Sequence, residues 1–258
     1  MELNFYKYHG TGNDFILVDD RRNNFTSIDL RTIQKLCERR FGIGSDGIIF
    51  IRECDDADFE MDFYNPDGSK SFCGNGSRCA VSFANRLGMI SEACTFRAVD
   101  GMHEAKLVGE RVSVKMRDVE EVEVGIDHHF IDTGSPHYIV YRDDINSIDL
   151  VKEARIIRYG ERFAEEGTNV NLVKETSEGV FVRTYERGVE DETYSCGTGV
   201  TAVALSYGLL HPEANHVNIE TKGGKLEVSF RSAGENRFSD IWLTGPAKRV
   251  FTGKIEID

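Results

Sequence analysis

Two cysteines stand in matching turns whose surroundings favour thiol chemistry. Cys73 is followed by Gly74-Asn75-Gly76 and Cys196 by Gly197-Thr198-Gly199, and each turn leads into an apolar segment with helical spacing. A cysteine at the start of a helix lies beside unpaired N–H groups and the positive end of the helix dipole, which favour a thiolate. The glycines let the backbone close around an anion. Two such turns in one chain suggest a site with a thiol on either side.

An internal repeat relates the two turns. The cysteines are separated by 196 − 73 = 123 positions, and Thr11-Gly12-Asn13-Asp14 is echoed by Thr133-Gly134-Ser135-Pro136 at 133 − 11 = 122. Gly44-Ser45-Asp46-Gly47 is likewise echoed at residues 167–170. The same features in the same order at nearly constant spacing predict an internal duplication, with two mixed α/β halves related by a pseudo-twofold axis. The period is far too long for a solenoid.

The expected boundary falls near residues 120–124. We expect residues 1–122 to form an N-terminal half with Cys73, joined by a final strand at 249–258, and residues 123–248 to form the half with Cys196. If the halves face each other, both cysteines point into one cleft and lie on opposite faces of a ligand carbon. That geometry would move a proton from one face to the other.

Helix and strand signals follow the same order in both halves. A helix is expected over residues 27–40, capped by Ser27 or Asp29 and ended by Gly42, with an equivalent near Leu150. Strands are expected at 47–53 and 59–64, and a hairpin set at 95–98, 104–108 and 112–117.

Composition restricts the class of protein. The chain has 258 residues and a net charge of −13, from 31 basic and 44 acidic side chains, which disfavours nucleic acid and anionic membrane as partners. No apolar run approaches the roughly 18 residues of a membrane span, and the N-terminus lacks the apolar stretch of a signal peptide. We therefore expect a cytoplasmic protein whose six cysteines are free thiols.

The chain resembles the diaminopimelate epimerase family over essentially its whole length. The resemblance is carried by residues 7–15, 64–69, 73–79, 134–137, 168–170 and 185–188, and by the turn at 196–199. It implies an α/β (mixed α+β) fold of two duplicated halves, each a mixed sheet or barrel around a central helix. It also implies an isomerase that interconverts LL- and meso-2,6-diaminopimelate in lysine and peptidoglycan precursor synthesis, without pyridoxal phosphate, another cofactor or a metal, and as a homodimer.

The resemblance also assigns roles to individual positions. Cys73 and Cys196 would be the catalytic acid and base, and His137 and Glu186 would assist them. The substrate would be bound by Asn13, Asn65, Gly74, Asn75, Asn169, Glu186, Arg187, Gly197 and Thr198. Ser135 and Gly47 depart from the pattern, because the family often has Asn and sometimes Gln at these positions.

The residues fit that chemistry. Removing an α-proton without a cofactor places negative charge on the adjacent carboxylate, where helix N–H groups can stabilise it. One thiolate must accept a proton while the other thiol donates one, so the two titrate as a pair. Two alternatives remain: a proline racemase or hydroxyproline epimerase, which would not need Glu186 and Arg187, and a thiol redox or ligand-binding protein that uses the cysteines as a switch.

Overall fold

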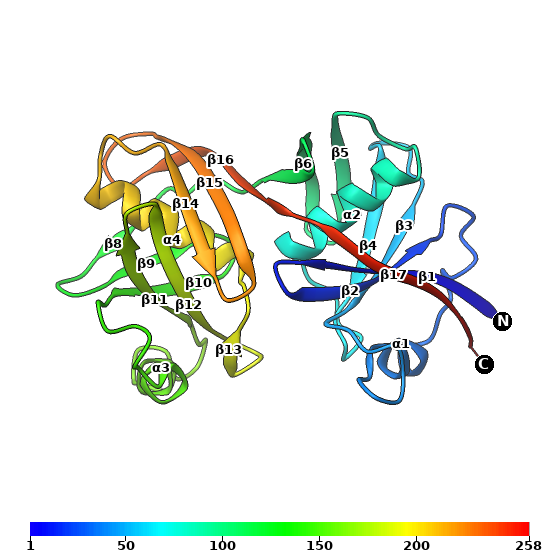
Figure 1. Ribbon diagram of the computed structural model, residues 1–258, viewed down its shortest axis with the longest axis horizontal. Coiled ribbons are helices and arrows are strands. Elements are labelled where there is room, and N and C mark those ends of the chain that lie inside the picture. Colours follow the sequence, from blue (N-terminus) through cyan, green and yellow to red (C-terminus); the bar gives the residue numbers. More distant parts are fainter. Residues whose placement is uncertain (258) are drawn as a thin grey trace. The chain divides into compact units, whose positions relative to one another are not determined.

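The computed structural model describes residues 1–257 and divides into two compact units. Unit 1 comprises residues 1–114 together with the segment that begins at Gly245, and unit 2 comprises residues 115–244. Each unit contains one mixed sheet and two helices (Figure 1).

The sheet of unit 1 is ordered β17-β1-β2-β3-β4-β5-β6-β7. Its strands are β1 (Glu2–Gly10), β2 (Asn13–Asp19), β3 (Ile48–Arg52), β4 (Phe59–Tyr64), β5 (Ala93–Ala98), β6 (Gly101–Val108), β7 (Arg111–Lys115) and β17 (Lys248–Glu256). The pairings β2–β3 and β4–β5 are parallel and the others antiparallel. Parallel neighbours require crossovers, which contain α1 (Leu30–Cys37) and α2 (Gly74–Arg86).

The two helices of unit 1 cover opposite faces of the sheet because its central strands are apolar on both faces. Phe15 and Leu17 of β2 join the cluster around α2, whereas Ile16 and Val18 join the cluster around α1. Strands β3 to β7 also contribute to the cluster around α2. Helix α2 therefore has apolar side chains of the sheet around it, and its first residue is held in a fixed place.

The sheet of unit 2 is ordered β8-β9-β10-β11-β12-β14-β15-β16. Its strands are β8 (Glu123–Val124), β9 (His129–Asp132), β10 (Pro136–Tyr141), β11 (Asn169–Thr176), β12 (Gly179–Glu186), β14 (His216–Thr221), β15 (Gly224–Ser232) and β16 (Phe238–Pro246), with the short β13 (Asp191–Thr193) also on β12. The pairings β10–β11 and β12–β14 are parallel. Their crossovers contain α3 (Leu150–Arg158) and α4 (Gly197–Leu210).

The core of unit 2 repeats the arrangement of unit 1. Helix α4 is apolar around most of its circumference, as a helix enclosed by a sheet must be, and Val200 to Leu205 are all buried. They pack against apolar residues of β9 to β12 and β14 to β16. Helix α3 packs on the other face, where Leu150 and Ala154 meet Val170 and Leu172.

The same sequence of parallel and antiparallel pairings in both units confirms the mixed α/β class and the internal duplication. The expected helix at residues 27–40 was too long, because α1 spans only Leu30–Cys37 with Asp29 as its N-cap. Glu38 already has extended geometry, and Arg39 binds Asp14 and Asp46, so these tertiary ion pairs draw the chain out of the helix.

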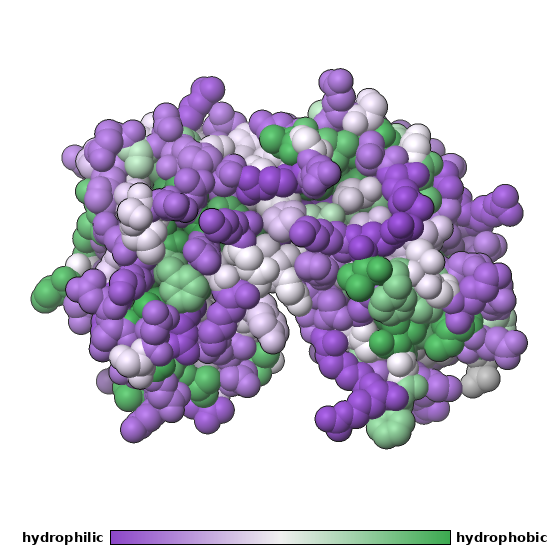
Figure 2. All heavy atoms as spheres, in the orientation of Figure 1, coloured by the Kyte–Doolittle hydropathy of each residue, from purple (hydrophilic) through white to green (hydrophobic). Residues whose placement is uncertain are grey.

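Hydrophilic residues cover most of the face drawn in Figure 2, and hydrophobic residues form separate small groups. This distribution accords with the charged composition of the chain. Within residues 1–257, no helix has the length and apolar character needed to cross a membrane.

Candidate active site

Cys73 is the N-cap residue of α2. Its backbone is extended, with φ −135° and ψ 109°, and its sulfur accepts a hydrogen bond from Gly76 N at 3.4 Å. The sulfur also lies 3.7 Å from Asn13 Oδ1, at the start of β2. Cys73 is partly exposed, whereas Gly74 and Asn75 are buried. The α2 N-terminus therefore presents a thiol and backbone N–H groups together.

The Asn13 amide is held in one orientation by Asp46. Its Nδ2 donates to Asp46 Oδ2 at 2.7 Å, and its Oδ1 accepts from Asn75 Nδ2 at 3.2 Å. A carboxylate can only accept hydrogen bonds, so the Asn13 oxygen faces Cys73. Sequence reasoning missed Asp46, although it lies in the repeated Gly44–Gly47 segment.

Asn65 lies in the turn after β4 and stabilises that turn. Its Nδ2 donates to Ser69 Oγ and Ser71 Oγ, both at 3.1 Å, and its backbone N donates to Ser69 O at 2.8 Å. Within residues 1–257, the hydrogen bonds of this side chain go to Ser69 and Ser71 and not to another predicted site residue.

Cys196 is the N-cap residue of α4, with φ −115° and ψ 117°. Its sulfur lies 3.4 Å from Thr198 Oγ1, and Thr198 Oγ1 lies 2.9 Å from His137 Nε2. Thr133, directly after β9, donates its hydroxyl to Thr198 O at 2.8 Å and so supports this first turn. A chain of contacts thus joins His137, Thr198 and Cys196.

Asn171, which sequence reasoning missed, determines the role of His137. Thr184 Oγ1 donates to Asn171 Oδ1 at 2.9 Å, so Asn171 Nδ2 faces His137 Nδ1 at 3.1 Å and donates to it. The proton of the neutral ring is therefore on Nε2, directed at Thr198. The Thr198 hydroxyl keeps its own hydrogen, which it can donate to the sulfur of Cys196 when that sulfur is a thiolate.

His137 acts as a neutral group. It is completely buried, and desolvation, assisted by the positive charge of Arg187, lowers its pKa to about 3. An imidazolium next to the sulfur is thus absent at neutral pH. Any influence of His137 on Cys196 passes through the Thr198 hydroxyl.

Asn169 and Arg187 are brought together at the same end of unit 2. Arg187 N donates to Asn169 Oδ1 at 2.9 Å, and Asn169 Nδ2 donates to Ser135 Oγ at 2.9 Å. Arg187 Nη1 donates to Glu166 O at 2.7 Å. Glu186 ends β12 and is partly buried. Ser135 therefore serves as an acceptor for Asn169.

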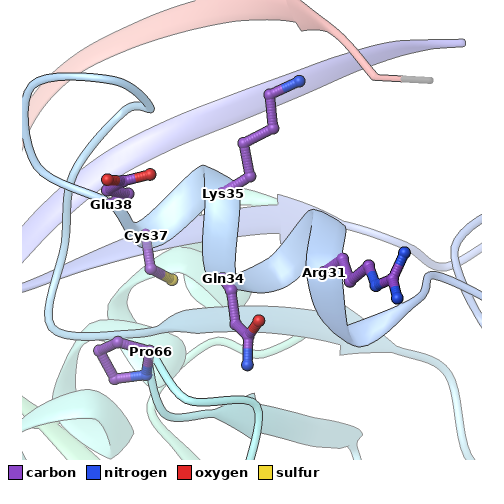
Figure 3. A pocket seen from close by; sticks show the side chains of 6 residues that line it. All are labelled: Arg31, Gln34, Lys35, Cys37, Glu38 and Pro66. Carbon is purple, nitrogen blue, oxygen red and sulfur yellow. The ribbon is translucent and has the colours of Figure 1, made fainter.

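A hollow beside α1 contains none of the predicted site residues. It is lined by Arg31, Gln34, Lys35, Cys37, Glu38 and Pro66, and Figure 3 shows Gln34 and Cys37 directed to the side where Pro66 lies. Among residues 1–257, no group of three or more His, Cys, Asp or Glu side chains is placed to hold a metal ion.

Each unit thus presents one sulfur at the N-terminus of its enclosed helix. A sulfur can exchange a proton, and adjacent N–H groups can stabilise negative charge on a carboxylate. The two environments differ, because Cys73 faces an amide oxygen and Cys196 faces a hydroxyl.

Comparisons with known proteins agree with this geometry. The family model described as Diaminopimelate epimerase matches residues 5–122 and 129–250. The diaminopimelate epimerase of Flavobacterium psychrophilum is 46% identical over 254 residues, which cover 96% of this chain and 98% of the relative. That of Aquifex aeolicus is 38% identical, with 98% of both chains covered.

Solved structures show the same fold at low sequence identity. A PhzF-family phenazine biosynthesis protein from Bacillus anthracis has a TM-score of 0.80 at 14% identity and full coverage of both chains. A probable proline racemase from Agrobacterium radiobacter has a TM-score of 0.71 at 15% identity, with 99% of this chain and 93% of that chain covered.

Proposed function

The chain belongs to the diaminopimelate epimerase family, and on this premise we propose that Cys73 and Cys196 perform the proton transfers that interconvert LL- and meso-2,6-diaminopimelate. The protein is an isomerase of lysine biosynthesis with a small-molecule substrate. We propose in addition that it works in the cytoplasm, as a homodimer and without a cofactor. Unchanged activity after dialysis against a chelator and a pyridoxal trap would support the last point.

The reaction requires stabilisation of a carbanion next to a carboxylate. Its charge spreads onto the carboxylate oxygens as the α-proton leaves. We assign the N–H groups of Gly74 and Asn75, and those of Gly197 and Thr198, to these oxygens, because donors at a helix N-terminus are fixed before the charge develops.

The two thiols take complementary roles. For one stereoisomer a thiolate removes the α-proton from one face, while the other thiol donates a proton to the opposite face. The reverse reaction exchanges the roles. The observation that carries this proposal is that both cysteines are N-cap residues of equivalent helices in duplicated units.

The remaining predicted residues would recognise the other parts of the substrate. A distal carboxylate suits the planar guanidinium of Arg187, and a distal ammonium suits the carboxylate of Glu186. Asn13, Asn65 and Asn169 would contribute amide contacts or hold their neighbours. Their present partners support a holding role for Asn13, which contacts Asp46, and for Asn169, which contacts Ser135.

Isotope incorporation tests the two-thiol reaction. Each pure stereoisomer is incubated in deuterated water with the wild-type enzyme, and early product should carry deuterium while unreacted substrate stays largely unlabelled. Cys73→Ala and Cys196→Ala should both abolish epimerisation, and each should retain at most slow exchange on one isomer, opposite for the two variants.

Cys54→Ala is the matched control, because Cys54 lies in a loop outside both sites and should tolerate the change. Proline serves as the control substrate. Near-normal epimerisation by either active-site variant would refute the two-thiol reaction, and exchange on proline rather than diaminopimelate would favour the racemase alternative.

A further inference from the structure

Arg78 is a buried cation without an acidic partner. It lies on α2, five positions after Cys73 (78 − 73 = 5), and is 0% exposed. Its Nη2 donates to Asn75 Oδ1 at 3.0 Å and to Thr11 Oγ1 at 3.2 Å, and its Nε donates to Pro246 O at 3.4 Å. Its Nη1 is buried without a hydrogen-bond partner.

Such a group is costly, because a buried charge is normally compensated by an opposite one. No acidic side chain in the described part of the chain forms an ion pair with Arg78. Burial lowers its pKa to about 10, so the guanidinium remains charged at neutral pH. The fold therefore keeps an uncompensated positive charge at this position.

Among the charged and titratable groups that act on Arg78, one could carry a negative charge that attracts it. Arg111 repels it, and burial raises the pKa of Cys79 to about 12, which keeps that thiol neutral. Cys73 is the remaining group whose negative charge would attract the guanidinium. A fixed cation is thus directed at the turn that carries the proposed carboxylate site.

The second unit has no such charge on its helix. The position equivalent to Arg78 is Thr201, since 78 + 123 = 201, and its hydroxyl donates to Gly197 O at 2.9 Å. The two helix N-termini, similar in backbone, therefore differ in their internal charge.

Close packing around Gly10 restricts the guanidinium group of Arg78. A Cβ atom added at Gly10 would lie 3.0 Å from Asn75 O and 3.2 Å from Arg78 Nη2. The guanidinium thus has little room to move, and it holds the Asn75 side chain that in turn contacts Asn13.

We propose that Arg78 is a positioning residue of the Cys73 site, which orients Asn75 and supplies a fixed positive charge that draws a carboxylate to the first turn of α2. The inference rests on the proposed function for the identity of the carboxylate, that of an amino acid substrate. It makes the Cys73 site more attractive to anions than its backbone alone would be.

Alkylation with two small reagents tests this charge without the substrate. Iodoacetate carries a carboxylate and iodoacetamide is neutral, and both react with the thiolate, so the ratio of their rates at Cys73 reports the local field. Arg78→Gln should lower this ratio by about threefold to tenfold. The ratio at Cys196, measured by peptide mapping in the same samples, should not change.

Arg86→Gln is the matched control, because Arg86 is an exposed residue in the last turn of the same helix. Its ratio at Cys73 should equal that of the wild type. Arg78→Lys retains the positive charge but not the planar guanidinium. Its alkylation ratio should stay within about twofold of the wild-type ratio, whereas its kcat/KM on diaminopimelate should fall at least about tenfold.

An unchanged ratio in a folded Arg78→Gln enzyme would overturn the proposal. If Arg78→Gln does not fold, Arg78→Lys decides. A ratio of the two alkylation rates at Cys73 that falls more than about twofold below the wild-type ratio refutes the fixed charge, and a kcat/KM equal to that of the wild type refutes the positioning role. The alkylation assay needs no diaminopimelate, so it can show the effect of Arg78 on Cys73 even if the protein does not epimerise diaminopimelate. Failure of this proposal and failure of the proposed function can therefore be told apart.

Discussion

Replacing Thr198 by Val removes the hydroxyl that joins His137 to Cys196 while nearly preserving the side-chain shape. Thr198 Oγ1 lies 3.4 Å from the sulfur and 2.9 Å from His137 Nε2. A hydrogen bond to a charged group contributes about 1.5–3 kcal/mol. Since 1.36 kcal/mol corresponds to about tenfold in rate, kcat/KM should fall roughly 10- to 150-fold.

The same change should also destabilise the protein. His137 is completely buried, and without Thr198 its Nε2–H has no acceptor at that position. A buried unsatisfied donor costs about 1–3 kcal/mol, which denaturant unfolding can measure. The kinetic loss is measured by deuterium incorporation and by the rate of epimerisation of each pure isomer.

Two controls separate the hydroxyl from other effects. Thr198→Ser keeps the hydroxyl and should retain most activity. Thr201→Val makes the same exchange one turn further along α4, where the hydroxyl serves only Gly197 O, and should leave kcat/KM unchanged. If Thr198→Val retains kcat/KM within about twofold of the wild type, the assigned link from His137 to Cys196 is wrong.

Gly199→Ala should lower activity and destabilise unit 2 by about 1–3 kcal/mol, because the added Cβ would lie 2.8 Å from Asn171 Oδ1 and 3.2 Å from His137 Cε1. Its repeat counterpart Gly76→Ala meets only side-chain atoms at 3.3 Å or more and should cost less in denaturant unfolding; equal costs would contradict this reasoning. The pKa of His137, lowered from 6.5 to about 3, implies that the unfolded chain takes up a proton that the folded protein excludes. The free energy of unfolding should therefore fall as the pH drops from 6.5 towards 3, by up to about 1.36 kcal/mol per pH unit, and His137→Gln should flatten this dependence. Identical pH profiles for the two proteins would show that His137 does not titrate as described.

The sequence was sufficient to predict the helix starts at Cys73 and Cys196, because a turn of Cys-Gly-x-Gly before an apolar segment is a local signal. It was also sufficient for the duplication, since the same signals recur in the same order. It did not predict that both faces of β2 are buried, by α1 and by α2, because that depends on where the two helices pack.

The hydrogen-bond partners of the site could not be predicted. Asn171 meets His137 only because β10 and β11 pair in parallel with His137 opposite Asn169. That register depends on tertiary packing rather than on either strand's sequence. Asp46 and Arg78 were missed for the same reason, since a loop acid and a helix arginine resemble ordinary surface charges until the fold buries or pairs them.

The pairing of β17 with β1 means that unit 1 is completed by a segment that follows unit 2 in the chain. Met1 N donates to Ile257 O at 2.6 Å across 256 positions, and β1 and β17 run side by side in Figure 1. Unit 2 is a continuous segment, whereas the strands of unit 1 come from both sides of it. Loss of β17 would therefore leave β1 as an open sheet edge, which can pair with another chain, while residues 115–244 would keep their own strands.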